Sequence, residues 1–468
     1  MGKAKRADGP REGNASTPSL KIHVEEESSL SCAHAPPGHN GRKLSTYEEL
    51  IRSLSDRVVE AQQPIRILDA IKWEDDVEHA FFAAGCRELP PVSRDYYLSR
   101  PLPFDPEQKR REFLSIERDI RRRLGKHNAA GQIMTRTCAE YRQVVDLLVN
   151  RGTPAFAALS ERLYGGSADS FHAGDPTLAD LGRMLSGSLD NLARDAQLVP
   201  DEPVLDAGEA MHVLSERLTG FFGDSAAVRI RLSDGIVADA AAGSDYIKLR
   251  RDARFTLRDI RLLEVHEGWV HLGTTLNGQN QPICTFLSKG PPSSTLTQEG
   301  LAVLTEVLSF ASHPARVRRL AHRIQGVALA ESGADFLDVY RFFQGAGYSP
   351  RESYQHCVRI FRGSLPAGCG PFTKDLCYSK GFVHLYNFMR LAVSRGQVRR
   401  LPLLFCGKTN LDDIQTLALL AEEGLLAPPR YLPPPFANLQ ALAAWLCYAN
   451  FLPSFGISAK QEKKWSTG

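Results

Sequence analysis

The sequence has 468 residues, of which 43% are hydrophobic and 24% charged, and both fractions are ordinary for a globular protein. This length allows two or three packed units or one large enzyme domain. The formal net charge of +3 is small for the length, so we expect neither nucleic acid nor an anionic membrane as a partner. The nine cysteines form no CxxC pair, which favours reduced thiols and a cytoplasmic location over a disulfide framework.

The N-terminal residues 1–45 are rich in Gly, Pro, Ser and charge and poor in large apolar side chains, so we expect a disordered tail. They lack the apolar segment of a secretory signal, and no uninterrupted apolar stretch of the chain reaches the ~18 residues of a spanning helix. We divide the rest into a helical N-terminal region at 46–200, a catalytic region at 201–455 and a frayed C-terminus at 456–468.

Apolar residues recur at helical spacing in four segments of the N-terminal region. These segments are 45–62, 64–84, 107–125 and 135–150. The third segment contains the basic run RDIRRRLGK at 118–126. This run could contact nucleic acid, but we interpret it as a solvated helix face beside Glu112 and Glu117.

Strand signals follow a further helix, which we expect over about 203–222. VRIRL at 228–232 alternates apolar and basic residues, Ser-Asp-Gly predicts a turn, and IVADA at 236–240 predicts the second arm of a hairpin. YIKLR at 246–250 predicts a third strand. After residue 297 the pattern is mostly helical again. We therefore expect an α+β fold, mostly helical, with a small mixed β-sheet just upstream of the next helix.

That next helix carries the pattern His-Glu-x-x-x-His at 266–271, within LLEVHEGWVHLGTTLNGQNQP. Thr256 is expected to begin the helix in a capping box with Asp259. The zinc-protease pattern His-Glu-x-x-His is one residue shorter, and residues five apart on a regular α-helix point ~140° away from each other. A single π turn would return both imidazoles to one face, and Gly268 makes this distortion easier. A shared metal ion therefore predicts a π-bulge here, whereas the alternative is a core helix with two ordinary histidines.

A catalytic zinc site needs a third protein ligand and one position open to water. Glu299 lies 28 residues after His271, at the start of a second expected helix capped by Thr297. Glu306 follows two turns later, either as a carboxylate that orients a ligand histidine or as the ligand itself. Glu267 would be the general base, taking a proton from the zinc-bound water as that water attacks a carbonyl.

Several segments together resemble one family. HEGWVH, LNGQNQP and QEGLAVLTE are similar to the QEGLA-motif proteins of bacteria, some of which are described as modulators of flavohaemoglobin expression. These belong with the microtubule-associated tyrosine carboxypeptidases of animals, zinc metallopeptidases with an HExxxH motif. ILDAIKW, RGTPAFAALSERLYG and FRGSLPAGCGPFTKDLCY also look like family segments, so the resemblance covers roughly residues 45–450. The animal pattern is nearer HEIGTH, so the residues between the histidines differ here.

The resemblance implies a zincin-like metallopeptidase. In it His266, His271 and Glu299 would bind Zn²⁺, and Glu267 would be the catalytic base. The implied reaction is that of a zinc-dependent metallocarboxypeptidase, a hydrolase that removes a C-terminal residue, including an aromatic Tyr or Phe, from a peptide or protein. The small sheet would offer an edge strand along which an extended peptide can lie.

A carboxypeptidase also needs a cation for the terminal carboxylate and a donor for the developing oxyanion. Arg362 and Lys374 lie in segments bounded by glycines and are predicted to bind the carboxylate, with Tyr378 as the oxyanion donor. The alternative for the basic residues is structural ion pairing. The alternative function is a non-catalytic zinc-binding protein that regulates the expression of another protein. Glu267 favours the enzyme, because a protein without turnover needs no base beside its metal.

Four further residues are expected to be structural. Trp269 is interpreted as a packing residue rather than a substrate platform. Asn277 is expected to cap the C-terminus of the metal-binding helix, and Gln281 to shape the loop that follows. His384, in the apolar segment GFVHLYNF, is expected to be a satisfied core histidine.

Overall fold

The structure is a computed structural model, and it describes residues 43–452 apart from 194–203, 224–227, 235 and 244. Helices dominate the described residues, which also contain one three-stranded mixed sheet, so the predicted α+β class is confirmed. The predicted disordered tail lies outside the described residues except for residues 43–45, and the predicted frayed C-terminus lies wholly outside them.

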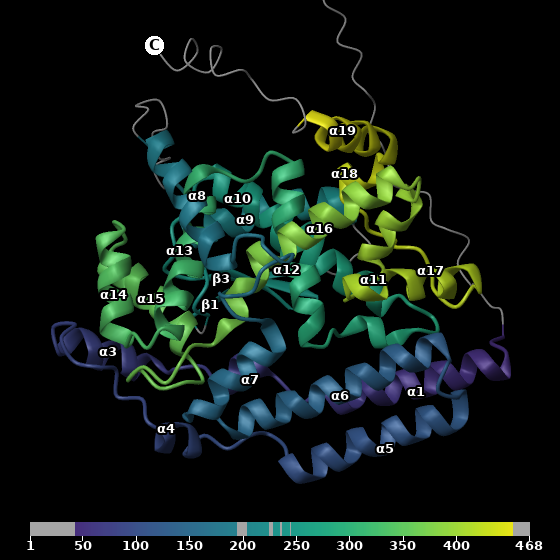
Figure 1. The fold of residues 1–468 in the computed structure, drawn as a ribbon, viewed down its shortest axis with the longest axis horizontal. Helices are drawn as coiled ribbons and strands as arrows, with labels where there is room; N and C mark the ends of the chain where they lie inside the picture. The colour runs from purple at the N-terminus through teal and green to yellow at the C-terminus, as the bar shows by residue number, and fades with distance from the viewer. Residues whose placement is uncertain (1–42, 194–203, 224–227, 235, 244, 453–468) are drawn as a thin grey trace, which may run out of the picture. The chain divides into compact units, whose positions relative to one another are not determined.

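Three long helices near the N-terminus lie side by side (Figure 1). They are α1 (Thr46–Gln62), α5 (Pro106–Leu124) and α6 (Ala129–Val149). The sequence sets their starts, because Ser45 closes a capping box with Glu48 and Asp105 caps α5 ahead of a proline. The basic run at the end of α5 pairs with acids of its own helix, such as Arg121 with Glu117 at 2.7 Å.

The segment 64–84, which we expected to form one helix, is divided. The shorter helices of this region are α2 (Ile67–Ala70), α3 (Asp75–Ala83), α4 (Arg94–Leu98), α7 (Pro154–Tyr164) and α8 (Leu178–Ala193). Between α2 and α3, Trp73 is buried and its indole N–H donates to the hydroxyl of Tyr97 at 2.7 Å. This tertiary contact fixes an extended Glu74 before α3, so packing overrides the local helical pattern.

The second half of the described chain is also mostly helical. Its α-helices are α9 (Ala207–Phe222), α10 (Leu257–Leu263), α11 (Gly273–Gln279), α12 (Pro292–Leu308), α13 (Pro314–Glu331), α14 (Phe336–Gly345), α15 (Pro350–Phe361), α16 (Cys377–Ser394), α17 (Ile414–Glu422), α18 (Pro434–Ala437) and α19 (Leu439–Phe451). Short 3₁₀ turns are η2 (Thr285–Ser288), η3 (Thr373–Leu376), η4 (Val398–Phe405) and η5 (Leu411–Asp413). The helix predicted over about 203–222 is confirmed as α9, which ends at Gly223.

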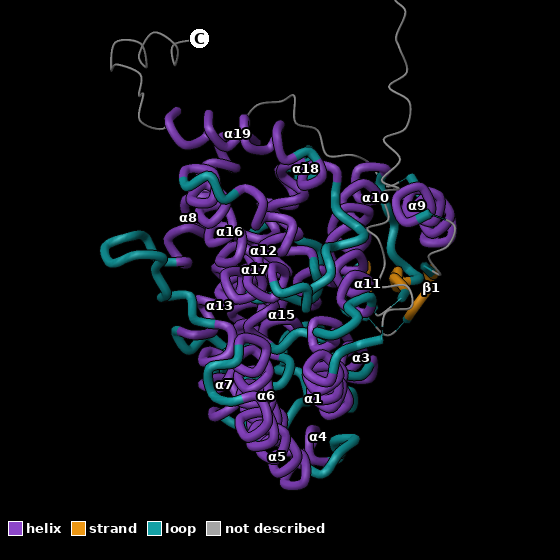
Figure 2. Tube along the Cα trace, turned by 90° about the vertical axis from the view of Figure 1, so that its right-hand side faces the viewer, coloured by secondary structure: helices purple, strands orange, loops and turns teal. Residues whose placement is uncertain are grey.

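The sheet consists of β1 (Arg229–Ser233), β2 (Ala240–Ala242) and β3 (Tyr246–Arg250), in the order β1-β3-β2. β3 runs parallel to β1 and antiparallel to β2, so the predicted hairpin between the first two strands is wrong. The second strand begins later than predicted and pairs with β3 instead, which leaves β2 at an edge. Figure 2 shows the strands on one side of the helices, beside α9.

The helices α12 and α16 cross at two glycines. A Cβ atom on Gly300 would lie 2.1 Å from the carbonyl carbon of Gly381, and one on Gly381 would lie 2.0 Å from the carbonyl oxygen of Leu296. Only glycine allows backbones to approach this closely. The crossing brings Glu299 of α12 and Tyr378 of α16 into the same interior.

Two further features follow from the described residues. None of their helices combines the length and the apolar composition that a bilayer crossing requires. Their eight cysteines form no disulfide with one another, which agrees with the expected reduced thiols.

Candidate functional site

The predicted distortion of the histidine helix is confirmed. Thr256 begins α10 in a capping box with Asp259, and α10 then widens into the π-helix η1 (Glu264–Leu272) before α11 follows. The π turn contains both histidines of the motif. Gly268 lies at its centre against α9, where an added Cβ would meet a methyl group of Leu218 at 2.3 Å.

Polar side chains satisfy the carbonyls at the end of the π turn. The hydroxyl of Thr275 donates to the carbonyl of His271 at 2.8 Å, and that of Thr274 donates to Val270 at 2.7 Å. The buried ammonium of Lys408 also donates to the His271 carbonyl at 2.8 Å. Irregular helical backbone leaves carbonyls that need such partners, so these donors stabilise the π geometry.

The π turn brings two imidazoles together with a carboxylate. The Nε2 atoms of His266 and His271 are 3.2 Å apart, and Glu299 Oε2 lies 3.6 Å from the first and 3.4 Å from the second. These three atoms lie within 4.8 Å of one another and could hold a metal ion. Glu299 lies in the middle of α12, because that helix begins at Pro292; the predicted cap at Thr297 is therefore wrong.

The donor atoms fit a cation. Glu299 Oε2 is buried and accepts no hydrogen bond, although a buried carboxylate oxygen normally has a donor. Glu306 Oε1 lies 2.6 Å from His266 Nδ1, which assigns the proton of that ring to Nδ1 and leaves the Nε2 lone pair directed at Glu299 and His271. Two imidazole nitrogens and one carboxylate oxygen in this arrangement are a donor set that could hold a metal ion.

Glu306 is fully buried behind His266. Its oxygens also accept from the guanidinium of Arg316, at 3.0 and 3.2 Å. Burial raises the pKa of Glu306, but Arg316 and His266 outweigh burial and hold that pKa at about 2. Burial lowers the pKa of His266, yet the neighbouring carboxylates of Glu299 and Glu306 raise it to about 9. The carboxylates around His266 therefore favour a positive charge at this position.

Glu267 lies beside the donor cluster, and the edge strand holds its carboxylate. Its Oε1 is 4.0 Å from His266 Nε2, and its Oε2 accepts a hydrogen bond from the backbone N–H of Ala242 at 2.8 Å. The sheet predicted upstream of the motif thus contacts the motif directly, through β2.

The three predicted substrate residues lie near the cluster in different environments. The ammonium of Lys374 donates to Glu299 Oε1 at 2.8 Å. The ring of Tyr378 stacks on that of His266, with the centroids 6.1 Å apart. Arg362 is buried, with its guanidinium 5.6 Å from the ring centre of Phe372.

The sequence analysis missed three cations of this interior, Arg316, Arg323 and Lys408. Arg316 and Arg323 belong to the run RVRRLAHR, whose composition is that of a solvated helix face, and Lys408 lies far from the motif in the chain. None of these positions carries a local pattern that marks it. Their contacts exist only because distant elements meet.

The residues expected to be structural have mixed outcomes. Trp269 is buried against Phe221, as predicted. Asn277 is no C-cap: it lies buried inside α11, and its amide bonds four backbone groups of the segments around Phe405 and Tyr431. His384 is only half buried, with its ring on Phe171, so the expected core position is wrong.

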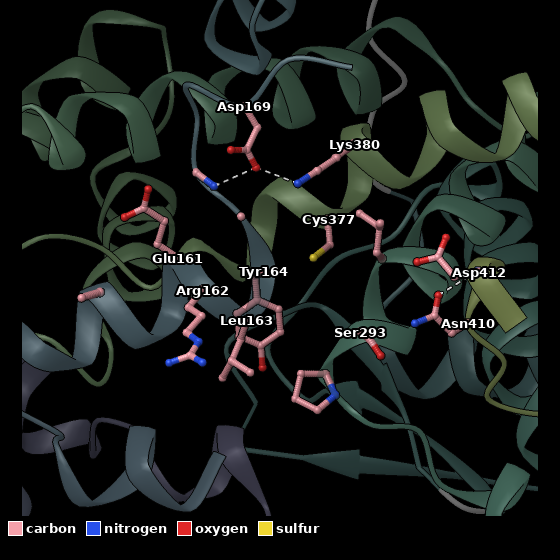
Figure 3. A pocket seen from close by; sticks show the side chains of 15 residues that line it. Glu161, Arg162, Leu163, Tyr164, Asp169, Ser293, Cys377, Lys380, Asn410 and Asp412 are labelled. Atoms are coloured by element: carbon pink, nitrogen blue, oxygen red, sulfur yellow. Dashed lines mark hydrogen bonds and ion pairs between the residues drawn. The ribbon is translucent and has the colours of Figure 1, made fainter. Parts of the chain in front are cut away.

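A cavity of about 580 Å³ lies between the end of α7 and the starts of α12 and α16 (Figure 3). Asp169 spans one side of it and accepts hydrogen bonds from Lys380 Nζ at 2.6 Å and from the backbone N–H of Gly166 at 3.1 Å. Cys377 also lines the cavity, but neither histidine of the motif does, so this cavity is separate from the donor cluster.

The fold and the donor cluster together define an α+β protein with a candidate single-metal site on two adjacent helices. The sequence matches the family model described as microtubule-associated tyrosine carboxypeptidase over residues 79–454. The chain therefore belongs to the microtubule-associated tyrosine carboxypeptidase family, which implies a peptidase that acts on peptide or protein C-termini. No curated protein matches the chain.

Proposed function

We propose that the protein is a zinc-dependent metallocarboxypeptidase that removes a C-terminal residue from a peptide or protein, with aromatic residues among those removed. The observation that carries the proposal is the convergence of His266 Nε2, His271 Nε2 and Glu299 Oε2 beside the carboxylate of Glu267. These three atoms would hold the ion, and Glu306 would orient His266 through Nδ1. When bound, zinc would polarise the scissile carbonyl and lower the pKa of a water molecule.

Glu267 would act as the general base. Its Oε1 is the carboxylate oxygen that lies toward His266, while the Ala242 N–H fixes the other oxygen. A base held in one orientation loses little freedom when it accepts a proton, which supports this role. The adjacent edge of β2 could add the substrate as an extended strand.

Three residues are proposed to bind the substrate. Arg362 and Lys374 remain the predicted partners of the terminal carboxylate, and Tyr378 the predicted donor to the oxyanion. The stacking of Tyr378 on His266 supports a position beside the reacting carbonyl. Lys374 would have to share its charge between the substrate and Glu299.

Digestion of a peptide library with free C-termini, followed by mass spectrometry, tests the proposal. The zinc-loaded protein should release single C-terminal residues, and the Glu267→Gln variant should bind zinc but release none. The variant is a matched control, because glutamine can still accept the Ala242 N–H. If the protein binds zinc but releases no residue from any peptide, the result would instead favour a regulatory zinc-binding protein.

A further inference from the structure

A second cluster of charge lies around Tyr378 and shares acids with the surroundings of His266, and cations outnumber acids in it. Its members are Arg316, Arg323, Arg359, Arg362 and Lys374 on the cationic side, and Glu299, Glu306 and Asp375 on the acidic side. Three of these cations have an acid of their own. Arg316 binds Glu306, Lys374 binds Glu299, and Arg359 makes two hydrogen bonds to Asp375, at 2.7 and 2.8 Å.

Two guanidinium groups have no acid of their own. Arg323 Nε lies 3.9 Å from the nearest acid, Asp375, both of whose oxygens already accept from Arg359. Arg362 makes no ion pair or side-chain hydrogen bond with any residue that the structure describes, although its side chain is buried. The Nε atoms of both arginines are buried without an acceptor. Burial lowers the pKa of each to about 10, and a buried charge without a partner costs several kcal/mol.

Arg323 lies next to Tyr378, whose ring also stacks on His266, so the excess positive charge lies near the donor cluster. Arg316 and Arg323 are two turns apart on α13, and their guanidinium carbons lie 5.7 and 5.9 Å from the ring centre of Tyr378. Arg316 Nη2 is also 3.5 Å from Nδ1 of His266. The ring centre of Tyr378 lies 6.1 Å from that of His266, so the guanidinium carbon of Arg323 lies at most about 12 Å from the ring centre of this candidate metal ligand.

The C-terminal residue of a substrate would fit within that distance. A carbonyl carbon lies ~3 Å from an ion that its oxygen contacts, given a metal–oxygen distance near ~2 Å. The terminal carboxyl carbon lies about 3.5 Å further along the chain, and a guanidinium carbon about 4 Å beyond it. The sum is about 10 Å. An arginine at this distance can make the bidentate contact that its planar fork gives to a carboxylate.

We propose that Arg323 binds the C-terminal carboxylate of the substrate, and that the buried Arg362 adds a second positive charge to the same cluster. The assignment deepens the proposed carboxypeptidase function and rests on it. It differs from the prediction for Lys374, because Lys374 is already held by Glu299 and Arg323 is not held by any acid of its own. The side chain of Arg323 retains 13% of its exposure, so it is not sealed from solvent.

Binding measured without turnover tests the assignment. Full-length Glu267→Gln protein, loaded with zinc, is titrated by calorimetry with one peptide that ends in tyrosine, first as the free acid and then as the amide. The acid should bind about 10–100-fold more tightly, which is the range for a hydrogen-bonded charged pair. Adding Arg323→Gln should abolish most of this preference, and Arg323→Lys should keep part of it, because the charge remains and the fork is lost.

Arg318→Gln is the matched control. It removes a guanidinium from the same helix, but from a position whose side chain contacts Leu189 of α8 instead of Tyr378. This variant should keep the full preference for the acid. An unchanged preference in both Arg323 variants would overturn the assignment, and loss of preference in Arg362→Gln or Lys374→Gln alone would place the carboxylate there.

Two measurements separate the carboxypeptidase function from the role of Arg323. Cleavage by the unsubstituted protein tests the carboxypeptidase function. The preference for acid over amide in the inactive background tests Arg323. Cleavage with no effect at Arg323 would refute the further inference and leave the proposed function intact, whereas a protein that neither cleaves nor binds any peptide acid would refute the function itself.

Discussion

Two buried clusters near Tyr378 are incomplete in opposite ways. In the donor cluster, two imidazole nitrogens and Glu299 Oε2 converge, and the carboxylate oxygen accepts no hydrogen bond. In the arginine cluster, the Nε atoms of Arg323 and Arg362 have no acceptor. Acceptors without a donor select a cation, and guanidinium groups without an acid select an anion. The pair suits a metal ion and a substrate carboxylate about one residue apart.

Two ion pairs join the clusters, Lys374 with Glu299 and Arg316 with Glu306. Glu306 binds His266 on the metal side and Arg316 on the arginine side, and both contacts are buried. Glu306 thus couples the orientation of His266 to the positive charge of Arg316 on α13. Single substitutions can perturb each cluster separately, and others can perturb the connection between them.

The largest effect is expected from Glu267→Gln, which alters only the donor cluster. Removal of a general base lowers turnover by about 10²–10⁴-fold. Zinc content and the affinity for acid peptides should not change, because neither the ligands nor Arg323 is altered. Single-turnover cleavage with metal analysis measures both, and a variant with near-normal turnover would show that the base lies elsewhere.

Asp375→Asn perturbs only the arginine cluster. It removes the acid that Arg359 binds and leaves three guanidinium groups without a carboxylate, at a cost of about 3–5 kcal/mol in the free energy of unfolding. Burial raises the pKa of Asp375, but Arg359 and Arg323 outweigh it and hold the pKa well below the ordinary value.

The sign of the pH dependence follows from that lowered pKa. Asp375 contributes its full stabilisation above its unfolded pKa of about 3.9 and loses it as the pH falls toward the folded pKa. The stability difference between the unsubstituted protein and Asp375→Asn should therefore shrink below about pH 4. Urea unfolding at several pH values measures it, and a difference that grows toward acid would contradict the ion-pair account.

Glu306→Gln tests the connection between the clusters. The amide oxygen can still accept from His266 Nδ1, but the negative charge is lost, so zinc affinity should fall by about 10–100-fold. Affinity for acid peptides should not fall, because Arg316 then adds positive charge beside Arg323. Competition with a chelator measures the first quantity. Unchanged zinc affinity would show that Glu306 acts only as the partner of Arg316.

The smallest effect is expected from Gly268→Ala, which touches neither cluster. The new methyl group would press on the side chain of Leu218, and overpacking costs about 1–3 kcal/mol, partly offset by about 1 kcal/mol of better helix propensity. A loss of about 1 kcal/mol of stability with full zinc content is expected from thermal unfolding and metal analysis. Loss of the metal would mean that the glycine itself is needed for the π turn.

The sequence predicts those features of the fold and the site that depend on residues close together in the chain. The five-residue spacing of the histidines required a π turn if they share an ion, and Thr256 and Asp259 marked the start of that helix, as observed. The sequence did not predict the order of the strands, because the pairing of β3 with both neighbours depends on non-local contacts. It also missed Arg316, whose role exists only because α12 and α13 meet.

The metal content of the purified protein is the most direct test of the central claim, that the π turn makes a zinc site with Glu299. Protein prepared without chelator and equilibrated with zinc should hold one ion per chain by mass spectrometry, and His271→Ala and Glu299→Ala should each lose it while remaining folded. A protein that binds no zinc, or variants that keep it in full, would contradict the account.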